Sequence, residues 1–211
     1  MNKFEEIMEP TVATTVIDIG GLSNNWKYVR SKPMVHLVNI RLQPEGDELP
    51  EQFTQAVGDG CNLPYADKEF DVAFSNSVIE HVGDFARQRQ FADEIRRVGR
   101  RVWAQTPSRW TFIEPHYICV FVHWLPKKWR VVLLKYFSVR GWLNRSEIPD
   151  MVDEIRLLDL SEMQELFPDC NILIERFLFF PKAYIAYRND PTLGREGREA
   201  HRGTTPYYLG K

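Results

Sequence analysis

Several features that mark special classes of protein are missing from this sequence. Its three cysteines, Cys61, Cys119 and Cys170, form no CxxC pair, so we expect neither a disulfide framework nor a zinc or other metal site. No apolar run reaches the roughly 18 residues that span a bilayer, and the segment MNKFEEIMEP is too charged for a signal peptide. The formal net charge of -2 gives no general attraction to nucleic acid or anionic membrane. We therefore expect a cytoplasmic globular protein that does not bind nucleic acid.

The 211 residues suit one domain with a substantial core. The composition changes after Pro107, because residues 109–145 are rich in aromatic side chains and show little strand alternation. This favours a helical insertion laid over one edge of the domain. From residue 189 onward the chain is polar and glycine-rich. We predict a single domain over 1–188 with a helical lid at 109–145, followed by a loose tail over 189–211.

Short apolar and β-branched runs, each followed by turn residues, predict the strands. Along the chain they are Thr14–Ile19, Met34–Ile40, Phe53–Val57, Phe70–Phe74 and Arg101–Thr106. A closing antiparallel pair is expected from Cys170–Phe180 and Ala183–Arg188, with its turn at Pro181-Lys182.

Two helices stand out between these strands. Phe85–Val98 carries apolar residues on one face and arginines on the other, and Leu160–Phe167 has helical spacing with Ser161 as its cap. Ser23 or Asn24 is expected to cap a further short helix after the first strand. The arginines around the end of the longer helix are interpreted as a solvated helix terminus favourable to the dipole. They are Arg96, Arg97, Arg100 and Arg101.

The stretch GDGCNLPYADKEFDVAFSNSVIEHV, which begins at Gly58, combines two strand ends with small or acidic residues. In an open α/β sheet, ligands bind at the carboxyl edge, where the strand order reverses. The stretch resembles the GDGxxLPFxDxxFDxVxSxxVxEHV pattern of the small-molecule branch of the class I S-adenosylmethionine-dependent methyltransferases. The resemblance extends over residues 14–187.

This resemblance implies a Rossmann-like α/β fold: a mostly parallel twisted sheet with an antiparallel C-terminal strand pair and a helical lid. It also implies S-adenosylmethionine as cofactor, S-adenosylhomocysteine as product, and methyl transfer to O, N or C of a small molecule, such as a lipid-linked or secondary metabolite. A base is required only if the acceptor must lose a proton, because alignment of the reactants carries most of such a displacement.

The turn after the first strand, Asp18-Ile19-Gly20-Gly21, matches part of the family's E/D-x-G-x-G-x-G motif. Glycine lets the backbone approach the methionine end of the cofactor. The resemblance implies that Gly20 and Gly21 do this, while Asp18 organises the ammonium through the turn. Leu22 and Asn24 stand where the family has its second and third glycines, which is a departure from the motif. The alternative is a turn of structural value only.

Asn39 falls where a dinucleotide-type fold places an acid against the ribose, so a weaker ribose contact is expected there. The resemblance implies that Asp59 accepts from the adenine amine. It also implies that Gly60 and Cys61 offer backbone to the ring and that Leu63 packs on it. The alternatives are an ordinary strand-end asparagine and a plain Asp-Gly turn.

At the end of the fourth strand, Ser75 and Asn76 are expected near the methionine moiety. Two histidines are candidate general bases, His81 in the EHV motif and His116 in Glu114-Pro115-His116. A structural role for each is the competing interpretation. The substrate side is expected to include three residues of the second region: Trp110, Glu114 and His116.

Phe121–Phe137 mixes tryptophans, leucines and basic residues, and it is interpreted as a lid helix. An interfacial helix with peripheral membrane contact has the same composition but is not favoured. Two rival functions stay open. One is a catalytically inactive binding module that serves a partner protein. The other, a nicotinamide-dependent oxidoreductase, lacks a G-x-G-x-x-G after the first strand. The sequence does not indicate an oligomeric state.

Overall fold

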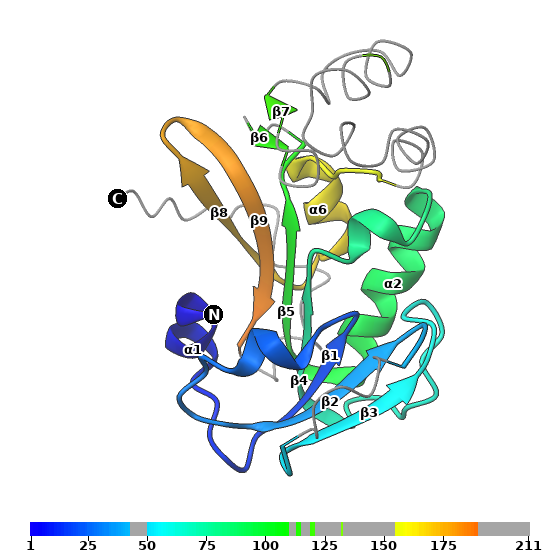
Figure 1. Cartoon of the computed structure of the whole chain (residues 1–211). Coiled ribbons are helices and arrows are strands. Elements are labelled where there is room, and N and C mark those ends of the chain that lie inside the picture. Colours follow the sequence, from blue (N-terminus) through cyan, green and yellow to red (C-terminus); the bar gives the residue numbers. More distant parts are fainter. Residues whose placement is uncertain (43–49, 110–112, 115–118, 121–131, 133–154, 190–211) are drawn as a thin grey trace.

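The computed structural model of the chain describes residues 1–42, 50–109, 113–114, 119–120, 132 and 155–189 (Figure 1). The strands of its main sheet are Thr15–Ile19 (β1), Met34–Asn39 (β2), Phe53–Val57 (β3), Phe70–Asn76 (β4), Gly99–Pro107 (β5), Asn171–Phe177 (β8) and Phe180–Arg188 (β9). The helical elements are Asn2–Met8 (α1), Ser23–Trp26 (η1), Ile79–His81 (η2), Phe85–Val98 (α2) and Leu160–Leu166 (α6).

The seven strands form one sheet in the order β3-β2-β1-β4-β5-β9-β8. The first five strands are parallel to one another, whereas β9 runs antiparallel to both of its neighbours, β5 and β8. This confirms the predicted Rossmann-like architecture with an antiparallel C-terminal pair. Strand order reverses at β1, between β2 and β4, which is where ligands bind in sheets of this kind.

Helices cover both faces of the sheet, and consecutive residues of β1 pack into different cores because side chains alternate along a strand. Ile17 lies in the core under α2 and α6, whereas Val16 lies in the core on the other face, with α1 and η1 (Figure 1). The second core centres on Phe4 of α1. Its ring makes edge contacts, with centroids 5.1 to 5.6 Å apart, with Trp26, Phe74 and Trp103.

The longest described helix, α2, has the bounds that its periodicity predicted. Its first turn is capped by Asp84, whose Oδ1 accepts from the Arg87 backbone N–H at 2.9 Å. Phe91, Ile95 and Val98 are buried against the sheet. This burial packs α2 along one face of the sheet.

Two predicted caps are wrong. Asp159, not Ser161, caps α6: its Oδ1 accepts from the Glu162 N–H at 3.0 Å, and the Glu162 carboxylate accepts from the Asp159 N–H at 2.9 Å. After β1 there is a 3₁₀ turn that starts at Ser23 and has no side-chain cap. Ser23 and Asn24 both lie inside that turn.

The closing hairpin turns earlier than predicted. β8 ends at Phe177 and β9 begins at Phe180, so Leu178 and Phe179 form the turn and Leu178 takes a positive φ of 55°. Pro181 pairs with Arg176 inside the hairpin, next to a register shift. Proline is tolerated beside such irregularities, which is why it did not mark the turn.

The predicted lid at 109–145 lies largely outside the described residues, as does the tail after Asn189. In the part that is described, Ile113–Glu114 (β6) and Cys119–Val120 (β7) form an antiparallel pair, so a wholly helical insertion is wrong. Among the described helices, none is long and apolar enough to cross a membrane.

Candidate functional site

The carboxyl ends of β1, β2, β3 and β4 meet along one edge of the sheet. The Gly20 N–H donates to the carbonyl of Val38 at 2.8 Å, and the Gly58 N–H donates to the carbonyl of Asn39 at 2.9 Å. The Ser75 hydroxyl donates to the carbonyl of Ile19 at 3.0 Å. The structure therefore gathers the residues predicted to bind a cofactor at one edge, and it does not scatter them.

Asp18 is a fully buried carboxylic acid at the end of β1. Its Oδ2 accepts from the indole N–H of Trp26 at 2.7 Å, while Oδ1 has no hydrogen-bond partner among the described residues. Burial raises the pKa of Asp18 to about 7, although the Trp26 bond opposes that rise. A buried acceptor with no partner is costly, and such groups occur where function requires them. Trp26 fixes the rotamer of the Asp18 side chain through this bond, and no sequence pattern marked it.

The two glycines after Asp18 are required by their surroundings. Gly20 has a φ of +80°, and a Cβ there would lie 2.5 Å from a methyl group of Val78. A Cβ on Gly21 would lie 1.8 Å from Oδ2 of Asp18, so only glycine can follow the carboxylate this closely. The backbone of the turn thus lies directly against the buried acid.

Asn39 is used by the protein itself. Its side-chain N–H donates to the carbonyl of Gly21 at 3.0 Å, which ties the end of β2 to the glycine turn. The half-buried asparagine therefore supports the turn, and the predicted ribose contact would fall to its carbonyl oxygen.

Asp59 is also engaged. Its Oδ1 accepts from the Cys61 N–H at 2.9 Å, and its Oδ2 accepts from the guanidinium of Arg87 at 3.0 Å. These bonds, the Cys61 one first, lower the pKa of Asp59 below its ordinary value. The carboxylate is about half exposed and can accept further bonds. No sequence signal marked Arg87, because it lies 28 residues away.

The other predicted adenine contacts are more buried than expected. A Cβ on Gly60 would lie 2.5 Å from the Phe91 ring, so this glycine packs beneath α2. The Cys61 thiol donates to the carbonyl of Arg87 at 3.4 Å, and burial raises its pKa to about 11. Leu63 is part of the core under α2. The Asp59 carboxylate is therefore more accessible to a ligand than Gly60, Cys61 or Leu63.

Ser75 and Asn76 end β4, the strand next to β1. Ser75 is buried and its hydroxyl holds β1, so its role in the structure is to join the two strand ends. The Asn76 Oδ1 is buried and has no hydrogen-bond partner among the described residues. Within the described part of the chain, two neighbouring strands thus each end in a buried oxygen without a partner, one from Asp18 and one from Asn76.

Comparison with known proteins agrees with this geometry. Residues 24–101 match the family model described as a methyltransferase domain. A S-adenosylmethionine-dependent methyltransferase from Methanosarcina mazei is similar in structure with a TM-score of 0.51 at 13% identity, over 89% of this chain and 96% of that one. Residues 24–101 thus match a methyltransferase-domain model, and the chain shares the fold of this Methanosarcina protein.

Two further solved structures share this fold. Phosphoethanolamine N-methyltransferase 2 from Haemonchus contortus, solved with S-adenosyl-L-methionine, has a TM-score of 0.53 at 16% identity, over 82% of this chain and 37% of that one. The PH0226 protein from Pyrococcus horikoshii has a TM-score of 0.51 at 13% identity, over 90% of this chain and 86% of that one. This chain therefore spans well under half of the Haemonchus protein.

The EHV motif begins inside η2, which contains Glu80 and His81, before the start of α2. Glu80 is buried, and its Oε2 accepts from the hydroxyl of Thr106, near the end of β5, at 2.9 Å. Its carbonyl accepts from the Arg156 N–H at 2.9 Å. Glu80 thus ties three segments together, a structural role that the sequence analysis missed, while His81 beside it is exposed.

The region predicted to bind the substrate is described only in part. Glu114 lies in β6, but its side chain, like Trp110 and His116 as a whole, is outside the described residues. The roles of these three residues stay predictions. Within the described part of the chain, no group of three or more His, Cys, Asp or Glu side chains could hold a metal ion.

Proposed function

We propose that this chain binds S-adenosylmethionine at the carboxyl edge of the sheet and transfers its methyl group to a small-molecule acceptor. The observation that carries the proposal is Asp18, a buried acid that lies against the Gly20-Gly21 turn and has one oxygen with no partner among the residues that the structure describes. The methyltransferase domain match and the class I fold support the same assignment.

The residues at this edge fit the polar groups of the cofactor. Asp18 supplies negative charge behind the turn, where the methionine ammonium would be held. Asp59 presents a half-exposed carboxylate to the adenine amine, and Asn39 presents its carbonyl oxygen to the ribose. The cofactor supplies a methyl group on a sulfonium, which leaves readily, so the protein contributes mainly binding and alignment.

The acceptor would lie on the side of β6 and β7, beyond the end of β5. Within this proposal, Glu114, Trp110 and His116 bind the acceptor, and His116 or His81 removes a proton if the acceptor carries one. A histidine is suited to this because its ordinary pKa lies near neutrality.

Isothermal titration with S-adenosylhomocysteine tests the proposal. We expect saturable heat with a dissociation constant below a millimolar, together with a rise in Tm, because a ligand that binds only the folded state stabilises it. NAD is the matched control and should produce neither signal. Absence of both heat and thermal shift with S-adenosylhomocysteine would remove the cofactor from the proposal.

A second candidate is a methyltransferase-like module that no longer binds the cofactor and serves a partner protein. The observation that favours it is internal use of two predicted ligands: the Asn39 amide bonds to Gly21, and the Asp59 carboxylate bonds to Arg87 and Cys61. Arg87→Ala separates the candidates. If the cofactor binds and competes with Arg87 for Asp59, affinity for S-adenosylhomocysteine should stay or rise, whereas a module without cofactor shows no binding in either form.

A further inference from the structure

The tip of the β8–β9 hairpin exposes a run of large apolar side chains. Phe177 is 53% exposed, Leu178 78% and Phe179 88%. Phe180, which follows them, is 39% exposed. Single exposed apolar residues are ordinary on protein surfaces, but consecutive ones on a protruding turn mark a contact surface. In Figure 1 the hairpin curves away from the rest of the sheet at the upper left.

The backbone of the turn holds these side chains outward. Phe177 pairs with Phe180 across the turn, and the guanidinium of Arg176 donates to the carbonyl of Phe179 at 3.1 Å. Leu178 keeps a positive φ of 55°, which is strained for a residue with a branched side chain. A strained turn with apolar residues at its apex is hard to explain by folding stability alone, because none of these side chains is buried.

The shape of the tip indicates whether it contacts a protein or a membrane. Neighbouring residues of a β-ribbon point to opposite faces, so the exposed apolar side chains project on both faces and at the apex. A protein partner with one flat surface would cover only one face. The interfacial region of a lipid bilayer surrounds an inserted tip on all sides, and it readily accepts phenylalanine and leucine.

The charges next to the tip favour an anionic surface. Arg176 and Lys182 flank the apolar run and are exposed. The nearby carboxylate of Glu175 is paired with Lys3 at 3.1 Å. Basic residues beside an apolar insertion add electrostatic attraction to anionic lipid headgroups.

The hairpin tip lies at the same edge of the sheet as the candidate cofactor site. β9 is antiparallel to β5 and β8, so β8 ends in the direction in which β5 ends. Ala183 of β9 pairs with Pro107, the last residue of β5, and the tip extends beyond that pair. A surface that holds the tip would therefore face the edge that carries Asp18 and Asn76.

We propose that residues 177–180 insert into the interfacial region of a membrane that contains anionic lipid. The insertion does not depend on methyl transfer. Its consequence, which rests on the proposed function, is that the acceptor is a lipid or lipid-linked molecule presented at that surface. This assigns the membrane contact to the hairpin, a segment that the sequence analysis did not consider for it.

Flotation with vesicles of phosphatidylcholine, with and without phosphatidylglycerol, tests the proposal with the full chain. We expect binding to the anionic vesicles that weakens as salt increases, and a loss of at least about tenfold in partition for the double variant Leu178→Asp, Phe179→Asp. Lys182→Glu should lower binding to anionic vesicles and leave binding to neutral ones unchanged. Val12→Asp is the matched control, since Val12 is an apolar residue 71% exposed at a distant loop.

Circular dichroism and Tm establish that each variant is folded, and Phe179→Trp supplies an independent readout. Its emission should shift to shorter wavelength on adding anionic vesicles, relative to the wild type, whereas Tyr28→Trp should show no such shift. Equal partition of the wild type and the double variant would overturn the proposal. So would a concentration-dependent dimer that the double variant abolishes in the absence of vesicle binding. Because none of these measurements needs S-adenosylmethionine, they can fail or succeed independently of the titration with S-adenosylhomocysteine.

Discussion

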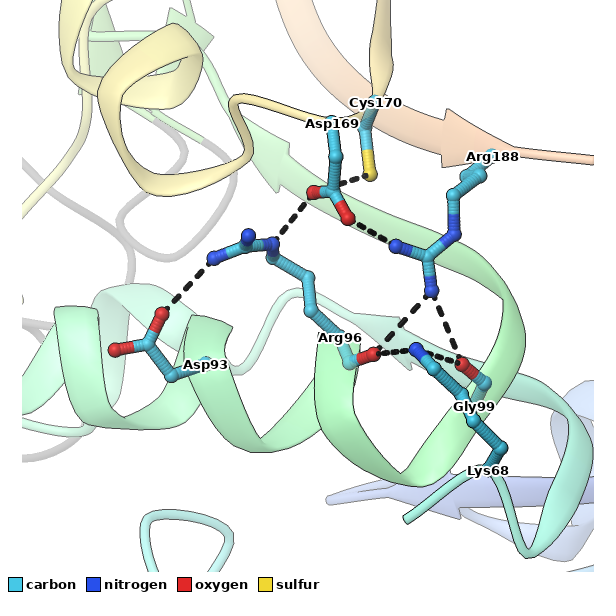
Figure 2. A network of polar contacts seen from close by, with 7 residues as sticks. All are labelled: Lys68, Asp93, Arg96, Gly99, Asp169, Cys170 and Arg188. Atoms are coloured by element: carbon cyan, nitrogen blue, oxygen red, sulfur yellow. Dashed lines mark hydrogen bonds and ion pairs between the residues drawn. The ribbon is translucent and has the colours of Figure 1, made fainter. Parts of the chain in front are cut away.

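The two edges of the parallel sheet treat their buried polar groups differently. At the carboxyl edge, Asp18 and Asn76 each bury an oxygen that has no hydrogen-bond partner among the described residues. At the amino edge, a network of side chains joins the starts of β4 and β5 to the end of β9 (Figure 2). The first arrangement leaves acceptors for a ligand, whereas the second pairs its buried charges within the protein, so that removing one partner is destabilising.

Arg188 is the centre of the amino-edge network. Its side chain is only 1% exposed and forms an ion pair with Asp169, and it donates to the carbonyls of Arg96 and Gly99 at 3.2 and 3.1 Å. Lys68 donates to the same two carbonyls. These carbonyls end α2, where cations interact favourably with the helix dipole. The Nε–H of Arg188 has no described hydrogen-bond partner, so even this network is incomplete.

The amino edge is marked by buried charges that are paired. The carboxyl edge, which is available for a ligand, is marked by buried acceptors that have no partner among the described residues. Breaking a buried pair is expected to destabilise the fold without changing the ligand site. Changing an unpaired acceptor is expected to weaken ligand binding and to raise the free energy of unfolding. Four predictions test this difference.

Asp169→Ala should produce the largest loss of stability. Burial alone would raise the pKa of Asp169, but Arg188 and Arg96 more than offset this and lower it, so the acid is charged and holds two arginines. Removing it leaves Arg188 buried without its partner, which costs about 3–5 kcal/mol. The measurement is urea unfolding at pH 7.

Asp93→Ala is the matched control for Asp169→Ala, because Asp93 also pairs with Arg96, at 2.9 Å, but is largely exposed. It should cost less than about 1 kcal/mol. Similar losses in the two variants would show that the amino edge is not held by its buried charges.

Asp18→Asn should stabilise the protein above neutral pH. The pKa of Asp18 rises from 3.8 to about 7 on folding, so the folded state binds more protons than the unfolded state between these values. Wild-type stability contributed by this group therefore falls as pH rises from about 4 to about 7, by as much as roughly 4 kcal/mol. The variant should lack that fall, and urea unfolding at pH 5 and pH 8 measures it.

At pH 8, where Asp18 is largely ionised, the same variant should bind S-adenosylhomocysteine more weakly, because the charge behind the glycine turn is gone. Greater stability at pH 8 together with weaker binding would confirm that the buried Asp18 carboxylate lowers stability and strengthens ligand binding. A variant with unchanged stability at both pH values would contradict the buried, proton-binding state of Asp18.

Asp59→Ala should weaken binding of S-adenosylhomocysteine by about 1–3 kcal/mol, the range expected when a buried donor of the ligand loses its acceptor. Stability should change little, since Asp59 and its partner Arg87 are both about half exposed. Asp67→Ala is the control, because Asp67 is likewise an exposed acid paired with an arginine, Arg97. An unchanged dissociation constant for Asp59→Ala would refute the adenine role.

Lys68→Met should have the smallest effect near pH 7, because Arg188 still donates to both carbonyls that Lys68 contacts. Burial lowers the pKa of Lys68 from 10.5 to about 8, so the unfolded state binds more protons between these values. The wild type should gain stability from pH 8 to pH 10, and the variant should not. Urea unfolding from pH 8 to pH 10 measures this. It shows whether the Lys68 dependence lies above the pH range in which Asp18 acts.

Much of the fold was predictable because its signals are local. The bounds of β3 and α2 follow the predicted ones, since apolar periodicity and the residues that flank a segment act within a few positions. The positions of Asp18, Asp59 and Ser75 at one edge were predictable for a related reason. Parallel strands end on the same side, so residues after successive strands become neighbours.

The contacts of those residues were not predictable. Arg96 and Arg97 were interpreted as a solvated helix end, yet Arg96 binds Asp169, 73 residues away, and Arg97 donates to the carbonyl of Leu63 at 3.0 Å. Asp59 pairs with Arg87 across 28 residues. Such pairs depend on how segments are brought together in space, and no pattern in a single sequence reports that.

The sequence by itself determined the order of elements, the parallel sheet and the residues that stand at its carboxyl edge, because each depends on local periodicity and strand direction. Only the tertiary structure decided which of those residues keep an unsatisfied group. Asp18 retains a buried oxygen, and Asn39 donates its amide to the glycine turn. The physical reason is that burial and hydrogen bonding are properties of three-dimensional neighbours, and these set whether an acceptor is left for a ligand.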